Sequence, residues 1–159
     1  MKTTIFKLSA FVLLFALMGA GCEKEEEYED VSLESLKCPC EHDVSFIKKI
    51  TVKNILLFDA IETTWDEMKA RTFDGEKSEF VAYSEESKSM IFYSIRTTMT
   101  GIGYVCNIPD KTCDWAIPST GVVISFNADA FDACSSPPSI GFSQTNYEII
   151  LTTLKRKIK

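Results

Sequence analysis

Gly121-Val-Val-Ile-Ser-Phe-Asn-Ala-Asp129 carries the pattern that decides the fold class. Its residues alternate in character, with Val122, Ile124, Phe126 and Ala128 on one parity and Val123, Ser125, Asn127 and Asp129 on the other. Because successive side chains of a strand point to opposite faces, this alternation predicts a half-buried β-strand. The alternation shifts at Ala130-Phe131, where we expect a β-bulge.

Strand patterns recur on both sides of this stretch. Residues 44–53 alternate in the same way, with Lys48 as the one exception on the apolar face, and Asn54 then marks a bend. The composition of strands is also found over residues 55–58, 80–83, 90–95, 104–107 and 147–154. Residues 85–88 are polar and predict a hairpin loop, residues 97–103 predict a turn-rich connection, and residues 155–159 predict a solvated end.

Residues 63–70 differ from their surroundings. Thr64 is followed three places later by Glu67, the spacing of a capping box, and good helix formers come next. The chain is therefore expected to be mainly β, with at most one short helix. A single small barrel or, as the alternative, a β-sandwich accommodates such elements.

The N-terminal segment has the layout of a secretory leader. Lys2 and Lys7 form a short positive region, and an uncharged, mostly apolar run over residues 8–21 ends in small residues directly before Cys22. This run is shorter than the ~20 residues that span a bilayer, which favours a cleaved signal peptide over a membrane helix. Stable anchoring requires more than one acyl chain, so we expect several on Cys22, palmitate among them.

Two short motifs at this point resemble those of a known class. Gly19-Ala20-Gly21-Cys22 resembles a bacterial lipobox, with Gly19 in place of the usual aliphatic residue. Cys22-Glu23-Lys24-Glu25-Glu26 resembles the lipoprotein export signal of Bacteroidetes, in which Lys24, Glu25 and Glu26 would direct the protein to the outer face of the outer membrane. The resemblance implies a surface lipoprotein anchored at Cys22.

The last third of the chain resembles small Bacteroidetes-type surface lipoproteins. Tyr104-Val-Cys-Asn-Ile-Pro-Asp110 is followed by the glycine-started strand at Gly121 and by Tyr147-Glu-Ile-Ile-Leu151, as in that group. The extra Cys113 and Pro118 depart from the pattern. This resemblance implies an OB-like five-stranded barrel and no particular activity.

Charge and length limit the partners and the organisation. The chain of 159 residues has a formal net charge of −6, and loss of Lys2 and Lys7 with the leader makes the remainder more acidic. Nucleic-acid binding requires a clustered basic face, so we expect no nucleic-acid partner. We expect a signal peptide over residues 1–21, an acidic flexible tether over 22–36 and a single β domain over 37–159.

The remaining cysteines fit an oxidising compartment. Five follow Cys22, namely Cys38, Cys40, Cys106, Cys113 and Cys134. They cannot all pair, and their spacing does not select one arrangement. Cys38 and Cys40 are too close together to favour bonding each other. The preferred hypothesis joins Cys106 to Cys134 and either Cys38 or Cys40 to Cys113.

Motifs for catalysis or metal binding are weak. His42 is the only histidine, and neither a Gly-x-Ser-x-Gly elbow nor a glycine-rich phosphate loop is present. Cys38-x-Cys40-x-His42 has soft ligands on one side of an extended chain, but disulfide formation competes in an oxidising compartment. We therefore expect no enzyme activity, no cofactor and no metal.

The two tryptophans are the candidate ligand contacts. Trp65 and Trp115 lie in segments expected to be outside strands, and their faces are suited to stacking on sugar rings, although ordinary packing is the plainer interpretation. The sequence predicts a surface-exposed outer-membrane lipoprotein acting as a non-enzymatic binding module, with a glycan or an envelope protein as partner. The alternative is a structural or protease-inhibitor-like envelope protein that uses the loop from Pro109 to Pro118.

Overall fold

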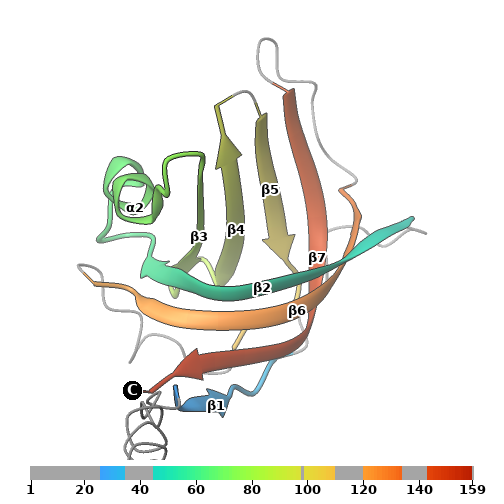
Figure 1. Ribbon diagram of the computed structural model, residues 1–159. Helices are drawn as coiled ribbons and strands as arrows, with labels where there is room; N and C mark the ends of the chain where they lie inside the picture. The colour runs from blue at the N-terminus through green and yellow to red at the C-terminus, as the bar shows by residue number, and fades with distance from the viewer. Residues whose placement is uncertain (1–25, 35–44, 98, 110–119, 134–142, 159) are drawn as a thin grey trace, which may run out of the picture.

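A computed structural model of the chain describes residues 26–34, 45–97, 99–109, 120–133 and 143–158. These residues form seven strands and one helix (Figure 1). The elements are β1 (Tyr28–Asp30), β2 (Phe46–Asp59), α2 (Trp65–Thr72), β3 (Lys77–Ser84), β4 (Ser89–Arg96), β5 (Met99–Val105), β6 (Val122–Asp132) and β7 (Ser143–Lys157).

The strands form one sheet that closes on itself. Their order is β1-β7-β5-β4-β3-β2-β6, and β6 returns to pair with β7, so six strands make a closed ring. The long β7 makes closure possible, because residues 143–149 pair in parallel with β5 and residues 147–156 pair antiparallel with β6. The predicted barrel is confirmed, and the sandwich alternative is wrong. The ring has six strands rather than the five of the OB-like expectation.

The difference from the sequence expectation lies mainly in β5. Residues 97–103 were predicted to be a turn-rich connection, but β5 begins at Met99 and pairs with both β4 and β7. Gly101 and Gly103 lie inside this strand. Glycine in a strand interior has no side chain to contribute to a period-two pattern, so the strand has a weak signal in the sequence.

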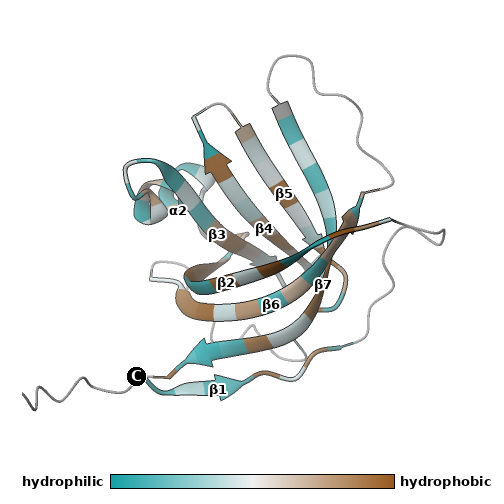
Figure 2. Ribbon diagram, turned by 45° about the vertical axis from the view of Figure 1, so that its right-hand side comes forward, coloured by the Kyte–Doolittle hydropathy of each residue, from teal (hydrophilic) through white to brown (hydrophobic). Residues whose placement is uncertain are grey.

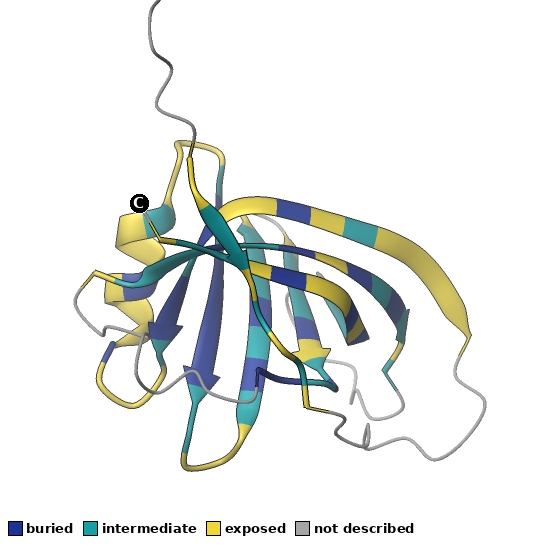
Figure 3. Ribbon diagram, turned by 90° about the horizontal axis from the view of Figure 1, so that it is seen from below, coloured by how far each residue is buried: buried dark blue, intermediate teal, exposed yellow. Residues whose placement is uncertain are grey.

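The barrel interior is the main hydrophobic core. Inward-facing side chains of all six ring strands pack there, and hydrophobic and hydrophilic bands alternate along β2, β6 and β7 (Figure 2). The members with least exposure include Leu57, Val81, Tyr83, Ile124 and Ile149. Buried positions lie on the strands around the interior, whereas α2 is mostly exposed (Figure 3).

Helix α2 covers part of the outer face of the barrel. The predicted capping box is present, because the Glu67 amide donates to Thr64 Oγ1 at 3.3 Å and the Thr64 amide donates to Glu67 Oε2 at 2.9 Å. The Thr64 hydroxyl, which donates to Glu67 Oε2 at 2.7 Å, and then the Thr64 amide lower the pKa of the Glu67 carboxyl. Met68 is the buried residue of the helix and packs against Phe58 and Phe80.

Strand β2 is irregular at two places. One register shift lies between Phe46 and Lys48, opposite Ala130 and Phe131, so the predicted bulge is present but its extra residue belongs to β2. The second lies between Val52 and Ile55 and includes Asn54, whose φ of 56° is in the left-handed region. Asparagine tolerates this conformation better than most residues, which explains the bend predicted there.

The expected tether is partly a component of the fold. Residues 22–36 were predicted to be flexible, but β1 pairs antiparallel with the end of β7, and Val31 and Leu33 pack against the core. Residues 155–157 are correspondingly not a solvated end. Acidic residues within 26–30 make ion pairs with basic residues 155–157 at the other end of the described chain, which local composition does not predict.

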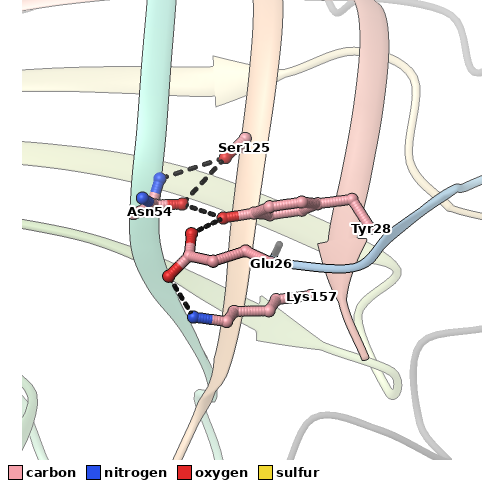
Figure 4. A network of polar contacts seen from close by, with 5 residues as sticks. All are labelled: Glu26, Tyr28, Asn54, Ser125 and Lys157. Carbon is pink, nitrogen blue, oxygen red and sulfur yellow. Dashed lines mark hydrogen bonds and ion pairs between the residues drawn. The ribbon is translucent and has the colours of Figure 1, made fainter. Parts of the chain in front are cut away.

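Specific side-chain contacts hold β1 in place (Figure 4). Lys157 Nζ lies 2.5 Å from Glu26 Oε1, and Arg156 makes an ion pair with Glu29. The Tyr28 hydroxyl lies within hydrogen-bond distance of both Glu26 and Asn54. Bonds from Lys157 and then Tyr28 lower the pKa of the Glu26 carboxyl, and the bond to Glu26 raises the pKa of Lys157.

Candidate functional site

One end of the barrel interior is not filled by side chains. A cavity of about 440 Å³ lies there, lined by β2, β3, β4, β5 and β7. Its rim is formed by the beginning of β3, β5 and β7 and by the end of β4, which lie at the top of Figure 1. Small-molecule sites commonly measure ~300–1,000 Å³, so the cavity is large enough for a small ligand.

Strand register arranges the cavity wall in three layers. Directly paired residues of neighbouring strands share a face of the sheet. The deepest layer contains Phe92, Gly103 and Tyr147, the middle layer contains Glu79, Ser94, Gly101 and Thr145, and the rim contains Lys77, Arg96 and Met99. The inward face of each wall strand therefore changes from apolar to polar toward the rim.

The sequence of β4 shows how this change arises. Met90 and Phe92 face inward and are buried, and the same parity then continues with Ser94 and Arg96. Strand β3 runs antiparallel to β4, so its inward face begins with Lys77 and Glu79 and becomes apolar afterwards. Both strands are amphipathic along their length as well as across their two faces.

The two glycines of β5 that line the cavity differ in what lies above them. A Cβ built on Gly103 would lie 2.0 Å from Ile149 Cδ1, so the isoleucine occupies the space above that glycine. A Cβ on Gly101 would meet only Ser94, at 3.6 Å or more. Gly103 is thus required by packing, whereas Gly101 leaves open space at the middle of the wall.

The cavity wall carries more positive than negative charge. Among its described lining residues, Lys48, Lys53, Lys77 and Arg96 stand beside a single carboxylate, Glu79. Lys77 Nζ lies 3.0 Å from Glu79 Oε2, and Ser94 donates to Glu79 Oε1 at 3.0 Å. These contacts neutralise Glu79 and fix its orientation.

The other three cations have no acidic partner among the described residues. Lys48 lies over the ring of Tyr147, with Nζ 4.8 Å from the ring centroid, and Lys48, Lys53 and Arg96 are all exposed. Beneath them the floor is apolar, because Val52 and Phe92 are buried and Phe92 packs edge-on against Phe126. Such a wall provides counter-charge at the rim and apolar surface at depth.

The cavity offers groups for binding rather than an evident reacting group. Its described lining contains hydroxyls, ammonium groups, one guanidinium, apolar side chains and the Glu79 carboxylate, which is held by Lys77 and Ser94, and it contains no cysteine or histidine. Among the described residues, His, Cys, Asp and Glu do not gather into a group of three that could hold a metal ion.

Most residues singled out from the sequence lie elsewhere. Trp65 begins α2 and packs against Phe80 and Tyr93, with ring centroids 5.3 and 4.7 Å apart, and it does not line the cavity. Trp65 remains 42% exposed, which leaves part of its surface free. Trp115, Cys22, Lys24, Glu25 and His42 lie outside the described residues, and Glu26 belongs to the contacts that hold β1.

Cys106 follows β5 and is disulfide-bonded. It is buried, and its amide donates to the Ile149 carbonyl at 2.8 Å. Cys38, Cys40, Cys113 and Cys134 lie outside the described residues, so the proposed pairing with Cys134 stays a prediction. Of the loop over residues 109–118, only Pro109 is described, and it is buried in a bridge to Leu33.

The sequence contained one signal for the cavity. Lys48 is the one polar residue on the apolar face expected for its strand, and its side chain lines the cavity. Ser94, Arg96 and Gly101 belong to the site as well, but each is an ordinary residue for a strand end or a turn. Their common location depends on strand pairing.

No protein-family model, curated protein or solved structure matches the chain. The part of the chain that the structure describes contains no helix with the length and hydropathy of a membrane span.

Proposed function

We propose that this chain is a lipid-anchored, surface-exposed protein of the outer membrane that binds a small ligand in the barrel cavity without converting it. The location is supported by the leader, by Cys22 and by the likeness of residues 22–26 to an export signal. The binding role is supported by the cavity, which carries both rim charge and an apolar floor.

The observation that carries the binding role is the open middle layer of the cavity. A stable barrel of this size ordinarily fills its interior with side chains. Here Gly101 occupies an inward position, and among the described residues a Cβ there would touch only Ser94. Space kept open beside unpaired cations is better explained by a ligand than by the stability of the barrel.

The binding role is tested by filling that space. Gly101→Leu places a side chain in the cavity, and Tyr104→Leu is the control because Tyr104 lies on the same strand and is exposed on its outer face. Native mass spectrometry of the protein purified from cells should detect a retained small molecule in the wild type and control. Its absence from the wild type, or its retention by Gly101→Leu, contradicts the proposal.

The anchor and its location need a separate test. Cys22→Ser should abolish incorporation of labelled palmitate. For surface export, Lys24 and Glu25 are replaced by alanine while Glu26 is kept, because Glu26 also contacts Lys157 in the fold. Protease applied to intact cells should digest the wild type and a Lys157→Met control but not the export variant. Protection of the wild type would refute surface exposure.

A further inference from the structure

The cavity has the opposite charge to the chain around it. The whole chain carries a formal net charge of −6. The described part of the cavity lining nevertheless includes four cationic side chains and one carboxylate. A local reversal of this kind attracts anions to one place on a protein that otherwise repels them.

Three of those cations are available to a ligand. Lys77 is paired with Glu79, and the Ser94 hydroxyl holds the carboxylate in that pair. Lys48, Lys53 and Arg96 make no ion pair among the described residues. Two of the three are lysines and one is an arginine, whose guanidinium suits the two oxygens of a carboxylate or sulfonate.

The apolar floor of the cavity favours an apolar group on the ligand, in addition to the anionic group favoured by the cations. Phe92 and Val52 present apolar surface at depth, and the Tyr147 ring lies beneath the Lys48 ammonium. A neutral sugar would leave the three cations without counter-charge. A small inorganic anion would leave the apolar floor uncovered. One ligand that satisfies both parts has an anionic head and an apolar body.

We propose that the cavity binds a small amphipathic organic anion, with its acidic head at Lys48, Lys53 and Arg96 and its apolar body over Phe92. This inference rests on the proposed binding function and specifies the class of ligand. It names a different class of ligand from the glycan considered from the sequence. Of the two tryptophans chosen there, Trp65 does not line the cavity and Trp115 lies outside the described residues.

The test compares four probes that separate charge from apolar surface. 4-Phenylbutyrate, 4-phenylbutyramide and 4-phenylbutylamine share one body and differ in head-group charge, and glucuronate is an anion without an apolar body. Each is titrated by calorimetry into the full chain as extracted from cells in a zwitterionic detergent, with a detergent blank. We expect one site per chain, the acid at least about tenfold tighter than the amide, and no measurable binding of the amine or glucuronate.

Charge variants assign the head-group contacts. Lys48→Gln and Arg96→Gln should each weaken the acid about threefold to tenfold and leave the amide unchanged. Lys49→Gln is the matched control, because it removes the same charge from the next position of β2 at an exposed residue outside the cavity lining. These three residues are exposed, so their replacement should not disturb folding.

The outcomes separate the two proposals. Equal affinity for the acid and the amide, or no effect of the charge variants, overturns the anion proposal while leaving binding in the cavity intact. Glucuronate as tight as phenylbutyrate overturns the requirement for an apolar body. If no probe binds, the anion proposal fails, and the retained molecule sought by native mass spectrometry still decides the binding role. If Gly101→Leu binds the acid as well as the wild type does, the cavity is not the binding site and both proposals fail.

Discussion

Gly101 and Gly103 lie two residues apart on the same face of β5, yet alanine should have opposite effects at the two positions. A Cβ at Gly103 would lie 2.0 Å from Ile149 Cδ1 and 2.9 Å from its Cγ1, so the isoleucine must change its rotamer inside a fully buried site. A Cβ at Gly101 would make only ordinary contacts, the nearest at 3.6 Å from the Ser94 carbonyl oxygen.

The expected magnitudes follow from these contacts. Overpacking of a core costs about 1–3 kcal/mol, and replacing glycine by alanine in a strand gains about 0.5–1 kcal/mol. Gly103→Ala should therefore lower the free energy of unfolding by about 0.5–2 kcal/mol. Gly101→Ala should raise it by about 0.5–1 kcal/mol, so the two variants differ by about 1–3 kcal/mol.

Urea unfolding followed by tryptophan fluorescence measures this difference. Ile149→Val removes the nearest clashing atom, so in the Gly103→Ala background it should cost less than its usual ~0.5–1.5 kcal/mol. The double-mutant cycle isolates that coupling between the two positions. Equal stability of Gly101→Ala and Gly103→Ala, together with additive effects of Gly103→Ala and Ile149→Val, would refute the packing argument.

Three further perturbations test other parts of the fold. Because the pKa of Glu26 is lowered in the folded protein, the Glu26 carboxylate stabilises the fold above its unfolded pKa near 4.5, and this stabilisation is lost as pH falls through the folded pKa. Amide hydrogen exchange in β1 should therefore accelerate on acidification. The acceleration should be much smaller in Lys157→Met, where the main hydrogen-bond partner of Glu26 is already absent. Trp65→Ala should destabilise the protein by about 1–2 kcal/mol through lost ring contacts with Tyr93 and Phe80, without changing ligand binding in the cavity. Altered binding would contradict the placement of Trp65 outside the site. Thr64→Ala should cost about 1 kcal/mol in urea unfolding because it removes the helix cap, whereas Thr64→Asn should retain most of it.

Local patterns predicted most of the barrel. The alternation from Val122 onward is strand β6, and the capping-box spacing of Thr64 and Glu67 starts α2. Each of these signals is contained within a few neighbouring residues. Strand geometry and helix capping act over that same range, so the sequence is sufficient to indicate them.

The remaining features depend on residues far apart in the chain. Pairing of Glu29 with Arg156 draws β1 onto β7, although each residue alone looks like part of a solvated end. The cavity likewise exists only once Arg96, Gly101 and Lys48 are brought to one end of the ring. The sequence marked Lys48 as an exception to its pattern, but it did not show which strands would surround it.

The position of β1 has a consequence for how the barrel would stand on a membrane. If Cys22 carries the proposed anchor, four Cα steps of 3.8 Å separate it from Glu26, so the fold begins at most about 15 Å from the lipid. Glu26 contacts Lys157 at the far end of β7, whereas the cavity is lined by Thr145 and Tyr147 near its beginning. Strand β7 curves between these two regions, and Figure 1 shows β1 at the bottom of the barrel and the strand ends that form the cavity rim at the top. The cavity rim would then face away from the bilayer, toward solutes arriving from the surrounding medium.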